Sequence, residues 1–173
     1  NLFRCELLGD NKKFMQQHVL KEGLKIVDLS MDYRLADESH DFVYGLPELN
    51  RKKIIRATHI ANPGCFATAI QLALLPLAKN LLLNKPVHVT AITGSTGAGQ
   101  KLSPTSHFSW RDNNLSIYKA FTHQHLAEIK ESLASLQQSV TDEINFIPVR
   151  GGFPRGIFAM AYTECPVALD EIV

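Results

Sequence analysis

Thr58-His-Ile-Ala-Asn-Pro-Gly-Cys65 joins a short strand-like run to a long apolar segment. The Asn-Pro-Gly step has turn composition, and from residue 66 to about residue 80 apolar side chains recur at helical spacing. Other alanines and leucines widen this stripe to nearly every face, which is typical of a buried helix. The positions that define the stripe are Ala67, Ile70, Leu74 and Leu77. The sequence therefore predicts a strand–turn–helix junction with Cys65 in the first helical turn.

The flanking segments predict further regular elements. Residues 36–50 are acidic and then marked by Gly and Pro, so we expect an irregular connection there. Further helices are expected over residues 11–19 and 123–138. Strands are expected over residues 25–30, 86–93, 143–148 and 156–163. We expect the last two strands to pair across the turn at 149–155, which would make the sheet antiparallel there.

Length, charge and cysteine content exclude several classes of protein. A chain of 173 residues with 45% hydrophobic and 20% charged residues can bury a core, so we expect a folded domain. The net charge is +1, so no sequence-wide field attracts nucleic acid or anionic lipid, and neither is expected as a partner. The longest apolar stretch, residues 66–83, is interrupted by Gln71, Pro76, Lys79 and Asn80, which argues against a membrane span. Three widely spaced cysteines without a CxxC pair favour a reducing compartment, so a cytoplasmic location is expected.

Cys65 is the strongest candidate for a reactive group. A sulfur in the first turn of a helix faces unpaired backbone N–H groups and the positive end of the helix dipole, and both favour the thiolate. A thiolate forms thioesters readily, so it suits acyl and carbonyl chemistry. The alternative is a small buried cysteine that only packs. The turn that delivers Cys65 strengthens the interpretation as a nucleophile.

His123, His125 and Glu128 supply a partner for a thiolate. His125 and Glu128 are three residues apart, so the carboxylate shares a helical face with the imidazole and can orient it. The trio also fits a capping histidine, a solvated charged face, or two ligands of a metal site. No third ligand stands at a recognisable spacing, so no metal site is expected.

Glycine-rich and arginine-rich segments provide candidate binding groups. Residues 94–99, Gly-Ser-Thr-Gly-Ala-Gly, follow a strand and allow the backbone to approach a phosphate or a nicotinamide amide, although a plain flexible turn has the same composition. Arg111, Arg150 and Arg155 are candidate clamps for a carboxylate or a phosphate, because a guanidinium binds both through two parallel hydrogen bonds.

Six segments, taken together in chain order, resemble the N-acetyl-gamma-glutamyl-phosphate reductases, NADP-dependent enzymes of arginine biosynthesis related to the aspartate-semialdehyde dehydrogenases. The resemblance extends over the chain from about Lys12. It is carried by residues 28–34 (DLSMDYR), 43–51 (VYGLPELNR), 61–69 (ANPGCFATA), 94–99 (GSTGAG), 123–129 (HQHLAEI) and 148–151 (PVRG).

The resemblance implies a role for each site residue. It makes Cys65 the nucleophile that forms a thioester, His123 or, as second choice, His125 its acid–base partner, and Glu128 the group that steadies the imidazole. The residues expected near NADP are Ser30, Gly94, Thr96, Gly97, Ala98 and Gly99. The residues expected near an acyl-phosphate or semialdehyde substrate are Asn62, Arg111, Tyr118 and Arg150. A homo-oligomer is also expected.

The resemblance also implies a fold and a division into domains. Residues 63–173 are expected to form an α+β catalytic and dimerisation domain like that of glyceraldehyde-3-phosphate dehydrogenase, with a mixed, largely antiparallel sheet and helices on one face. Residues 1–62 are expected to be the tail of a dinucleotide-binding α/β domain. No glycine fingerprint precedes Lys25, and residues 1–10 match the family poorly, so we expect a fragment that lacks the fingerprint and the C-terminal end.

Three other functions fit parts of the pattern. An aspartate-semialdehyde dehydrogenase would share the cysteine chemistry, although residues 44–50 and the HxHxxE cluster favour the glutamyl enzyme. A catalytically silent fragment could act as an assembly module through its sheet. A cysteine hydrolase could use Cys65 and His123 without any nicotinamide cofactor.

Overall fold

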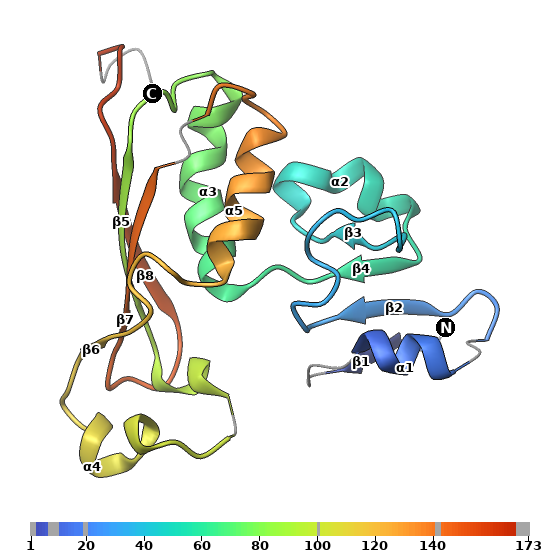
Figure 1. Cartoon of the computed structure of the whole chain (residues 1–173), viewed down its shortest axis with the longest axis horizontal. Helices are drawn as coiled ribbons and strands as arrows, with labels where there is room; N and C mark the ends of the chain where they lie inside the picture. Colours follow the sequence, from blue (N-terminus) through green and yellow to red (C-terminus); the bar gives the residue numbers. More distant parts are fainter. Residues whose placement is uncertain (1–2, 7–10, 19–20, 100, 141–142, 169–173) are drawn as a thin grey trace. The chain divides into compact units, whose positions relative to one another are not determined.

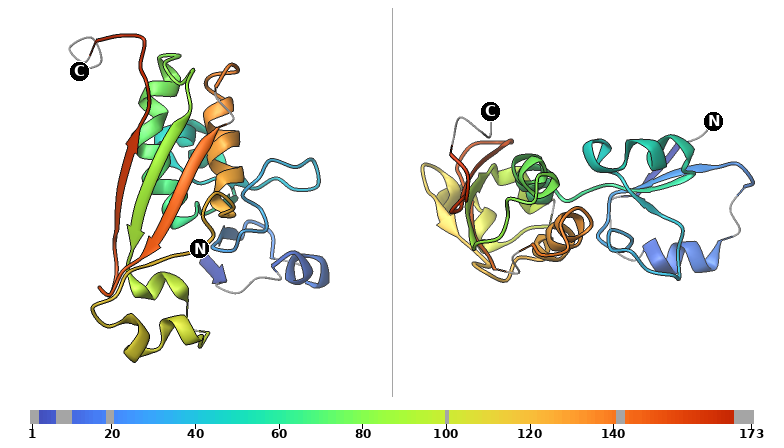
Figure 2. Two further views of the ribbon diagram at one scale, coloured as in Figure 1. Left: turned by 60° about the vertical axis from the view of Figure 1, so that its left-hand side comes forward. Right: turned by 90° about the horizontal axis from the view of Figure 1, so that it is seen from above.

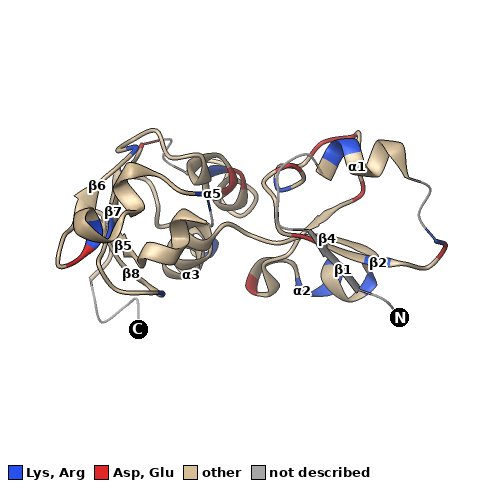
Figure 3. Cartoon of the chain, turned by 90° about the horizontal axis from the view of Figure 1, so that it is seen from below, with Lys and Arg blue, Asp and Glu red and all other residues tan. Residues whose placement is uncertain are grey.

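The computed structural model describes residues 3–6, 11–18, 21–99, 101–140 and 143–168, and it divides into two compact units, Asn1–Gly64 and Cys65–Val173. Each unit has its own sheet (Figure 1). Within the described residues, no helix has the length and apolar character needed to cross a bilayer. Basic and acidic residues are interspersed along both units (Figure 3), in keeping with the net charge of +1.

The first unit contains a parallel four-stranded sheet in the order β1-β2-β4-β3. Its strands are β1 (Phe3–Glu6), β2 (Lys25–Asp28), β3 (Val43–Tyr44) and β4 (His59–Ala61), and its helices are α1 (Asn11–Gln17) and α2 (Pro47–Arg56). Ile26, Tyr33, Leu46 and Ala61 are buried in this unit. The helix predicted at 11–19 is found over Asn11–Gln17, and residue 19 lies outside the described residues. The strands predicted at 25–30 and 58–61 are confirmed, with shorter bounds.

The interpretation of residues 36–50 as irregular throughout is wrong, because this segment contains β3 and the start of α2. Both elements lack the periodic signal that a prediction needs. β3 has only two residues, and α2 buries none of its side chains, so no apolar stripe marks it. Pro47 at the first turn of α2 and Lys53 and Arg56 in its last turn are the residue types that suit those positions.

The second unit contains a mixed sheet in the order β6-β7-β5-β8. Its strands are β5 (Val87–Thr93), β6 (Ser116–Ile117), β7 (Ile144–Arg150) and β8 (Ile157–Tyr162). Its α-helices are α3 (Cys65–Lys79), α4 (Phe108–Arg111) and α5 (His125–Ala134), and its 3-10 helices are η1 (Ser95–Ala98) and η2 (Pro104–Ser106). Helices α3 and α5 cover one face of this sheet (Figure 2). The predicted helices and strands of this unit are confirmed, with small differences at their ends.

The predicted pairing of the last two strands is wrong. β7 and β8 lie on opposite sides of β5, where β7 is parallel to β5 and β8 is antiparallel to it. β6 adds a second antiparallel pair on the outer side of β7. The connection between β7 and β8 is long enough to cross the end of β5, and Gly151 N–H donates to the Thr93 carbonyl at 2.8 Å as it crosses. β5 is therefore the central strand, hydrogen-bonded on both edges, and the unit has the mixed sheet expected of its class.

The core of the second unit lies between the sheet and the two helices. β5 alternates between buried and half-buried side chains, and its buried side faces the helices. The fully buried side chains include Phe66, Ile70, Leu74, Val87, Ile129, Leu133 and Phe146. No helix among the described residues of this unit covers the opposite face of the sheet, and β8 exposes Phe158, Met160 and Tyr162 there.

Candidate active site

Cys65 is the first residue of α3 and is exposed, whereas Gly64 before it and Phe66 after it are buried. The junction predicted from the sequence therefore brings a thiol to the start of a 15-residue helix. This position is the positive end of the helix dipole. Cys65 thus combines access to solvent with a place at the start of a long helix.

Phe66 connects the cysteine to the histidine pair. Its ring is T-shaped to the ring of His123 at 5.4 Å between centroids and also lies 6.3 Å from the ring of His125. The same ring packs against Phe146 of β7 at 5.2 Å. The residue that follows the thiol therefore lies against both imidazoles, so the start of α3 and the start of α5 meet at one place.

His123 is buried, and its ring is enclosed by aromatic side chains. Tyr118 and Phe146 make edge contacts with it at 5.8 and 5.5 Å, in addition to the contact with Phe66. Its Nδ1 accepts a hydrogen bond from the backbone N–H of His125 at 3.2 Å. Burial, followed by the neighbouring imidazole of His125, lowers the pKa of His123 to about 4. His123 is therefore neutral at neutral pH, with Nδ1 acting as an acceptor at the start of α5.

His125 and Glu128 lie in the first turn of α5 and are both buried. His125 Nε2 is 3.9 Å from Glu128 Oε1, so the carboxylate faces the imidazole as the three-residue spacing predicts. The rings of His123 and His125 are T-shaped to each other at 4.5 Å. The predicted catalytic histidines and glutamate are therefore brought together in one cluster.

Tyr118 and Arg150 form the other side of this cluster. The Arg150 guanidinium carbon lies 4.5 Å from the centre of the Tyr118 ring. Burial is the main cause that raises the pKa of Tyr118, and the negative charge of Cys65 raises it further, while Arg150 opposes both. Tyr118 is thus within electrostatic reach of the thiol. Arg150 Nε is buried and makes no hydrogen bond to the described residues, so the guanidinium keeps donor capacity.

Arg111 has a different environment from Arg150. It is buried, and its guanidinium donates to the carbonyl oxygens of Thr105, Asn114 and Arg150 and to the Ser116 hydroxyl. The shortest of these bonds, both 2.8 Å, join it to β6 and β7. The geometry favours a structural role for Arg111, which holds the loop containing α4 against the sheet.

The Gly94–Gly99 loop is fixed against the turn that follows β7. The N–H groups of Ser95 and Thr96 donate to the carbonyls of Phe153 and Pro154 at 2.8 and 3.1 Å. Those of Gly97 and Gly99 donate to carbonyls within the loop. These amides are therefore already used and do not form a phosphate cradle. Gly99 has a φ of +78°, and among the described residues no atom outside its chain neighbours lies within 4 Å of the position that a Cβ would take, so this side of the loop is open. The loop therefore offers an open side at Gly99 and no cluster of unused amides among Ser95, Thr96, Gly97 and Gly99.

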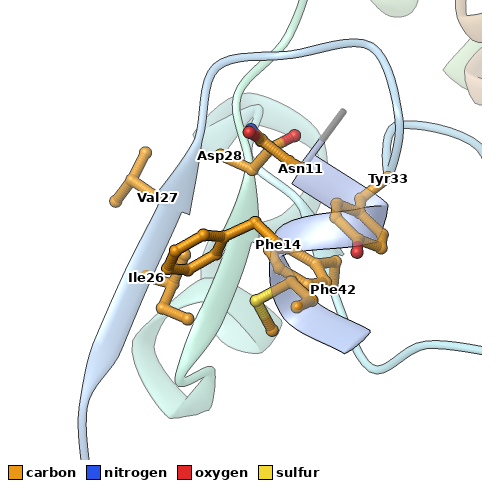
Figure 4. A pocket seen from close by; sticks show the side chains of 8 residues that line it. Asn11, Phe14, Ile26, Val27, Asp28, Tyr33 and Phe42 are labelled. Atoms are coloured by element: carbon orange, nitrogen blue, oxygen red, sulfur yellow. The ribbon is translucent and has the colours of Figure 1, made fainter. Parts of the chain in front are cut away.

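Ser30 and Asn62 belong to the first unit. Ser30 is buried, and its hydroxyl donates to Asp28 Oδ2 at 2.9 Å. The Asn62 carbonyl accepts a hydrogen bond from Arg34 Nε at 2.9 Å, which fixes the end of β4. The Asn11 amide donates to the other oxygen of Asp28, above an apolar hollow that includes Phe14, Tyr33 and Phe42 (Figure 4). These contacts stabilise the ends of β2 and β4.

Phe66, Phe146 and Lys119 are the site residues that the sequence patterns do not identify. Phe66 looks like any core residue of α3, and Phe146 like any inward residue of β7. Lys119 precedes the cluster in a stretch without periodicity. Of the described residues, no three or more His, Cys, Asp or Glu gather closely enough to hold a metal ion.

The second unit is thus an α+β domain with an exposed cysteine at the start of a helix, and a buried histidine pair lies against the residue after that cysteine. A family model described as "Semialdehyde dehydrogenase, dimerisation domain" matches residues 65–172, and one described as "Semialdehyde dehydrogenase, NAD binding domain" matches residues 7–57. The chain belongs to the semialdehyde dehydrogenase family.

The most specific similarity is to one enzyme of this family. The protein named N-acetyl-gamma-glutamyl-phosphate reductase from Parabacteroides distasonis is 66% identical over 171 residues, which cover 99% of this chain and 53% of the relative. The chain thus spans about half the length of the curated relatives it matches. The resemblance inferred from the sequence motifs is confirmed.

Two solved structures have the same fold. The aspartate semialdehyde dehydrogenase of Francisella tularensis superposes with a TM-score of 0.64 at 18% identity, covering 94% of this chain and 57% of that chain. The corresponding enzyme of Candida albicans, solved with NADP, gives 0.62 at 15% identity and covers 98% and 53%. At these identities the likeness is one of fold, and the predicted α+β class is confirmed.

Proposed function

We propose that this chain carries the reaction centre for the NADPH-dependent reduction of N-acetyl-gamma-glutamyl phosphate to the semialdehyde and phosphate, a cytoplasmic step of arginine biosynthesis. The substrate is supported by the names of relatives at up to 66% identity. The chemistry is supported by one observation above all, the exposed Cys65 at the start of α3 with Phe66 packed against both imidazoles.

The first half of the reaction is the work of Cys65. Its thiolate sulfur bonds to the acyl carbon of the substrate, and the bond from that carbon to the phosphate oxygen breaks with its electron pair, releasing phosphate. The helix start stabilises the thiolate before attack. NADPH, when bound, supplies the hydride that reduces the resulting thioester. The Gly94–Gly99 loop would border its nicotinamide, since the open side of Gly99 would admit a flat ring.

We assign the proton transfers to His125, positioned by Glu128. The carboxylate oxygen 3.9 Å from His125 Nε2 stabilises the imidazolium that forms when His125 carries a proton. His123 has a pKa of about 4, so its imidazolium is scarce at neutral pH, and its Nδ1 already accepts the His125 N–H. His123 therefore caps the start of α5 and lines the site as an uncharged side chain. This assignment reverses the order of preference drawn from the sequence.

We assign substrate recognition to Arg150 and Tyr118. The Arg150 guanidinium retains donor capacity and lies over the Tyr118 ring, which fixes its plane. A fixed guanidinium suits the substrate's carboxylate, because it can bind both oxygens. Asn62 and Ser30, of the first unit, remain candidates for the substrate and the cofactor. Arg111 supports the loop and does not touch substrate in this proposal.

We propose that the open face of the second sheet forms a dimer contact. The matched family is described as a dimerisation domain. β8 presents Phe158, Met160 and Tyr162, at 54 to 65% exposure, on the face that α3 and α5 leave uncovered. An apolar strip of this kind is typical of an interface between subunits.

Activity of the full-length protein containing this chain tests the proposal. Phosphate-dependent oxidation of N-acetyl-glutamate semialdehyde by NADP+ is the expected reaction, and Cys65→Ser should abolish it while leaving the far-UV spectrum unchanged. Aspartate semialdehyde should be a poor substrate. A retained rate in Cys65→Ser would refute the nucleophile, and a preference for aspartate semialdehyde would refute the substrate. Acyl transfer to water without any nicotinamide would instead identify a hydrolase.

A further inference from the structure

The proposed substrate carries two anionic groups, a carboxylate and a phosphoryl group, and this inference rests on that proposed function. Arg150 accounts for one of them. The second needs another cation near the acyl carbon, and Arg111 is committed to carbonyl oxygens of its own chain.

Lys119 is a second cation beside the histidine cluster. Its neighbour Tyr118 contacts His123 at 5.8 Å between ring centroids and senses the charge of Cys65. The Lys119 ammonium donates to Gln124 Oε1 at 2.9 Å, and Gln124 stands between the two histidines. Both Lys119 and Arg150 lie close enough to His123 to disfavour its protonation. One hydrogen bond leaves two N–H groups on an exposed ammonium.

The backbone around Lys119 holds an unfavourable conformation. Lys119 and Phe121 have φ values of +45° and +62°. Residues other than Gly, Asn and Asp rarely adopt this left-handed backbone region. The Phe121 N–H donates to the Phe146 carbonyl at 2.8 Å, and the Thr122 N–H closes a turn onto the Lys119 carbonyl at 3.1 Å. A simple surface turn would use residues that tolerate this conformation. Lys119 thus holds a strained backbone conformation next to the histidine cluster, and strained residues often lie at functional sites.

We propose that Lys119 binds the phosphoryl group of the acyl phosphate and the free phosphate of the reverse reaction. Arg150 then holds the carboxylate, and the two anionic ends of the substrate have separate cations. The charge that grows on the leaving oxygen as the carbon–oxygen bond breaks is stabilised by the positive charge of the Lys119 ammonium.

The experiment varies inorganic phosphate in the semialdehyde oxidation catalysed by the full-length protein. Lys119→Asn removes the charge but tolerates the left-handed backbone, so it keeps the turn. It should raise the KM for phosphate by about tenfold or more, the usual effect of losing a charge-assisted hydrogen bond, with the KM for semialdehyde within about twofold of wild type. Lys119→Arg should restore most of the phosphate affinity.

Gln124→Met distinguishes the effect of the Lys119 charge from the effect of its hydrogen bond to Gln124. The variant removes this hydrogen bond but keeps the ammonium. It should leave the KM for phosphate near the wild-type value. The inference is overturned if Gln124→Met reproduces Lys119→Asn, if Lys119→Asn leaves the KM for phosphate unchanged, or if it raises only the KM for semialdehyde.

A binding measurement keeps this test independent of the proposed function. Inorganic phosphate should slow alkylation of Cys65 by iodoacetamide in the wild type and in Lys119→Arg, but not in Lys119→Asn. If the wild type has no reductase activity yet shows this protection, the proposed function fails and the phosphate site stands. If phosphate protects Lys119→Asn as well as the wild type, the phosphate site fails.

Discussion

His123 is buried among Phe66, Tyr118 and Phe146, and its pKa of about 4 makes the folded protein sensitive to acid. In the unfolded chain an imidazole has its ordinary pKa of 6.5. Between these values the unfolded state binds a proton that the folded state does not, so stability falls as pH is lowered from 6.5 to 4. The contribution is fully present above pH 6.5, and its loss is roughly 3 kcal/mol at most.

Urea unfolding at several pH values checks this expectation. His123→Asn keeps an acceptor for the His125 N–H but cannot titrate, so its unfolding free energy should depend less on pH between 6.5 and 4. Equal pH dependence in both proteins would mean that folding does not lower the pKa of His123, and the assignment of acid–base work to His125 would lose its main support.

Arg111 and Arg150 should separate stability from substrate binding. Arg111→Met leaves the carbonyls of Thr105 and Asn114 without their donor, so it should lower the unfolding free energy by about 2–4 kcal/mol. Arg150→Met should change stability by less than about 1 kcal/mol and raise the KM for the semialdehyde. Urea unfolding and steady-state kinetics measure the two effects. The reverse pattern would restore Arg111 as the substrate clamp.

The joint between β5 and η1 depends on Gly94. A Cβ at this position would stand 2.6 Å from the Arg155 Cα and N, which are backbone atoms and cannot turn aside. Gly94→Ala should therefore push the loop away from the turn after β7 and destabilise the unit by about 1–3 kcal/mol. Gly97→Ala is the matched control, since its Cβ would meet only the Thr93 side chain at 3.0 Å. Similar melting temperatures for the two variants would show that the loop moves freely.

Individual elements are predictable where their signal is local. The apolar stripe of α3, the alternation in β5 and the spacing of His125 and Glu128 are all in the sequence, and the structure has them. The pairing partners of β7 and β8 cannot be predicted in this way, because no local sequence pattern indicates that both strands flank β5. The enclosure of His123 is also nonlocal, since it needs rings from α3 and β7. Its pKa, and so the choice between the histidines, follows only from tertiary contacts.

Assembly of the whole molecule should depend on the open face of the second sheet. Phe158→Asp places a charge in the exposed strip on β8, and burying that charge in an interface is unfavourable. Sedimentation should show a smaller assembly than wild type. Leu102→Asp, at a side chain 94% exposed in the loop before η2, should leave the assembly intact. If Phe158→Asp assembles like the wild type, the contact lies elsewhere.

The two units carry different functional parts of the molecule. The first has a parallel sheet, and its residues 7–57 match the family model of an NAD binding domain. The second carries the thiol, the histidine pair and Arg150. A chemistry based on a thioester therefore depends on the second unit for the bond that forms to carbon, and this is where the central claim can be tested.

Intact-protein mass spectrometry after mixing the full-length protein with N-acetyl-gamma-glutamyl phosphate, without NADPH, tests that claim most directly. We expect one N-acetyl-glutamyl group per chain, located on Cys65 by peptide mapping, removed by hydroxylamine and absent from Cys65→Ser. Phosphate should be released in an amount equal to the adduct. An adduct on another residue, or release of phosphate by Cys65→Ser at the wild-type rate, would contradict the account.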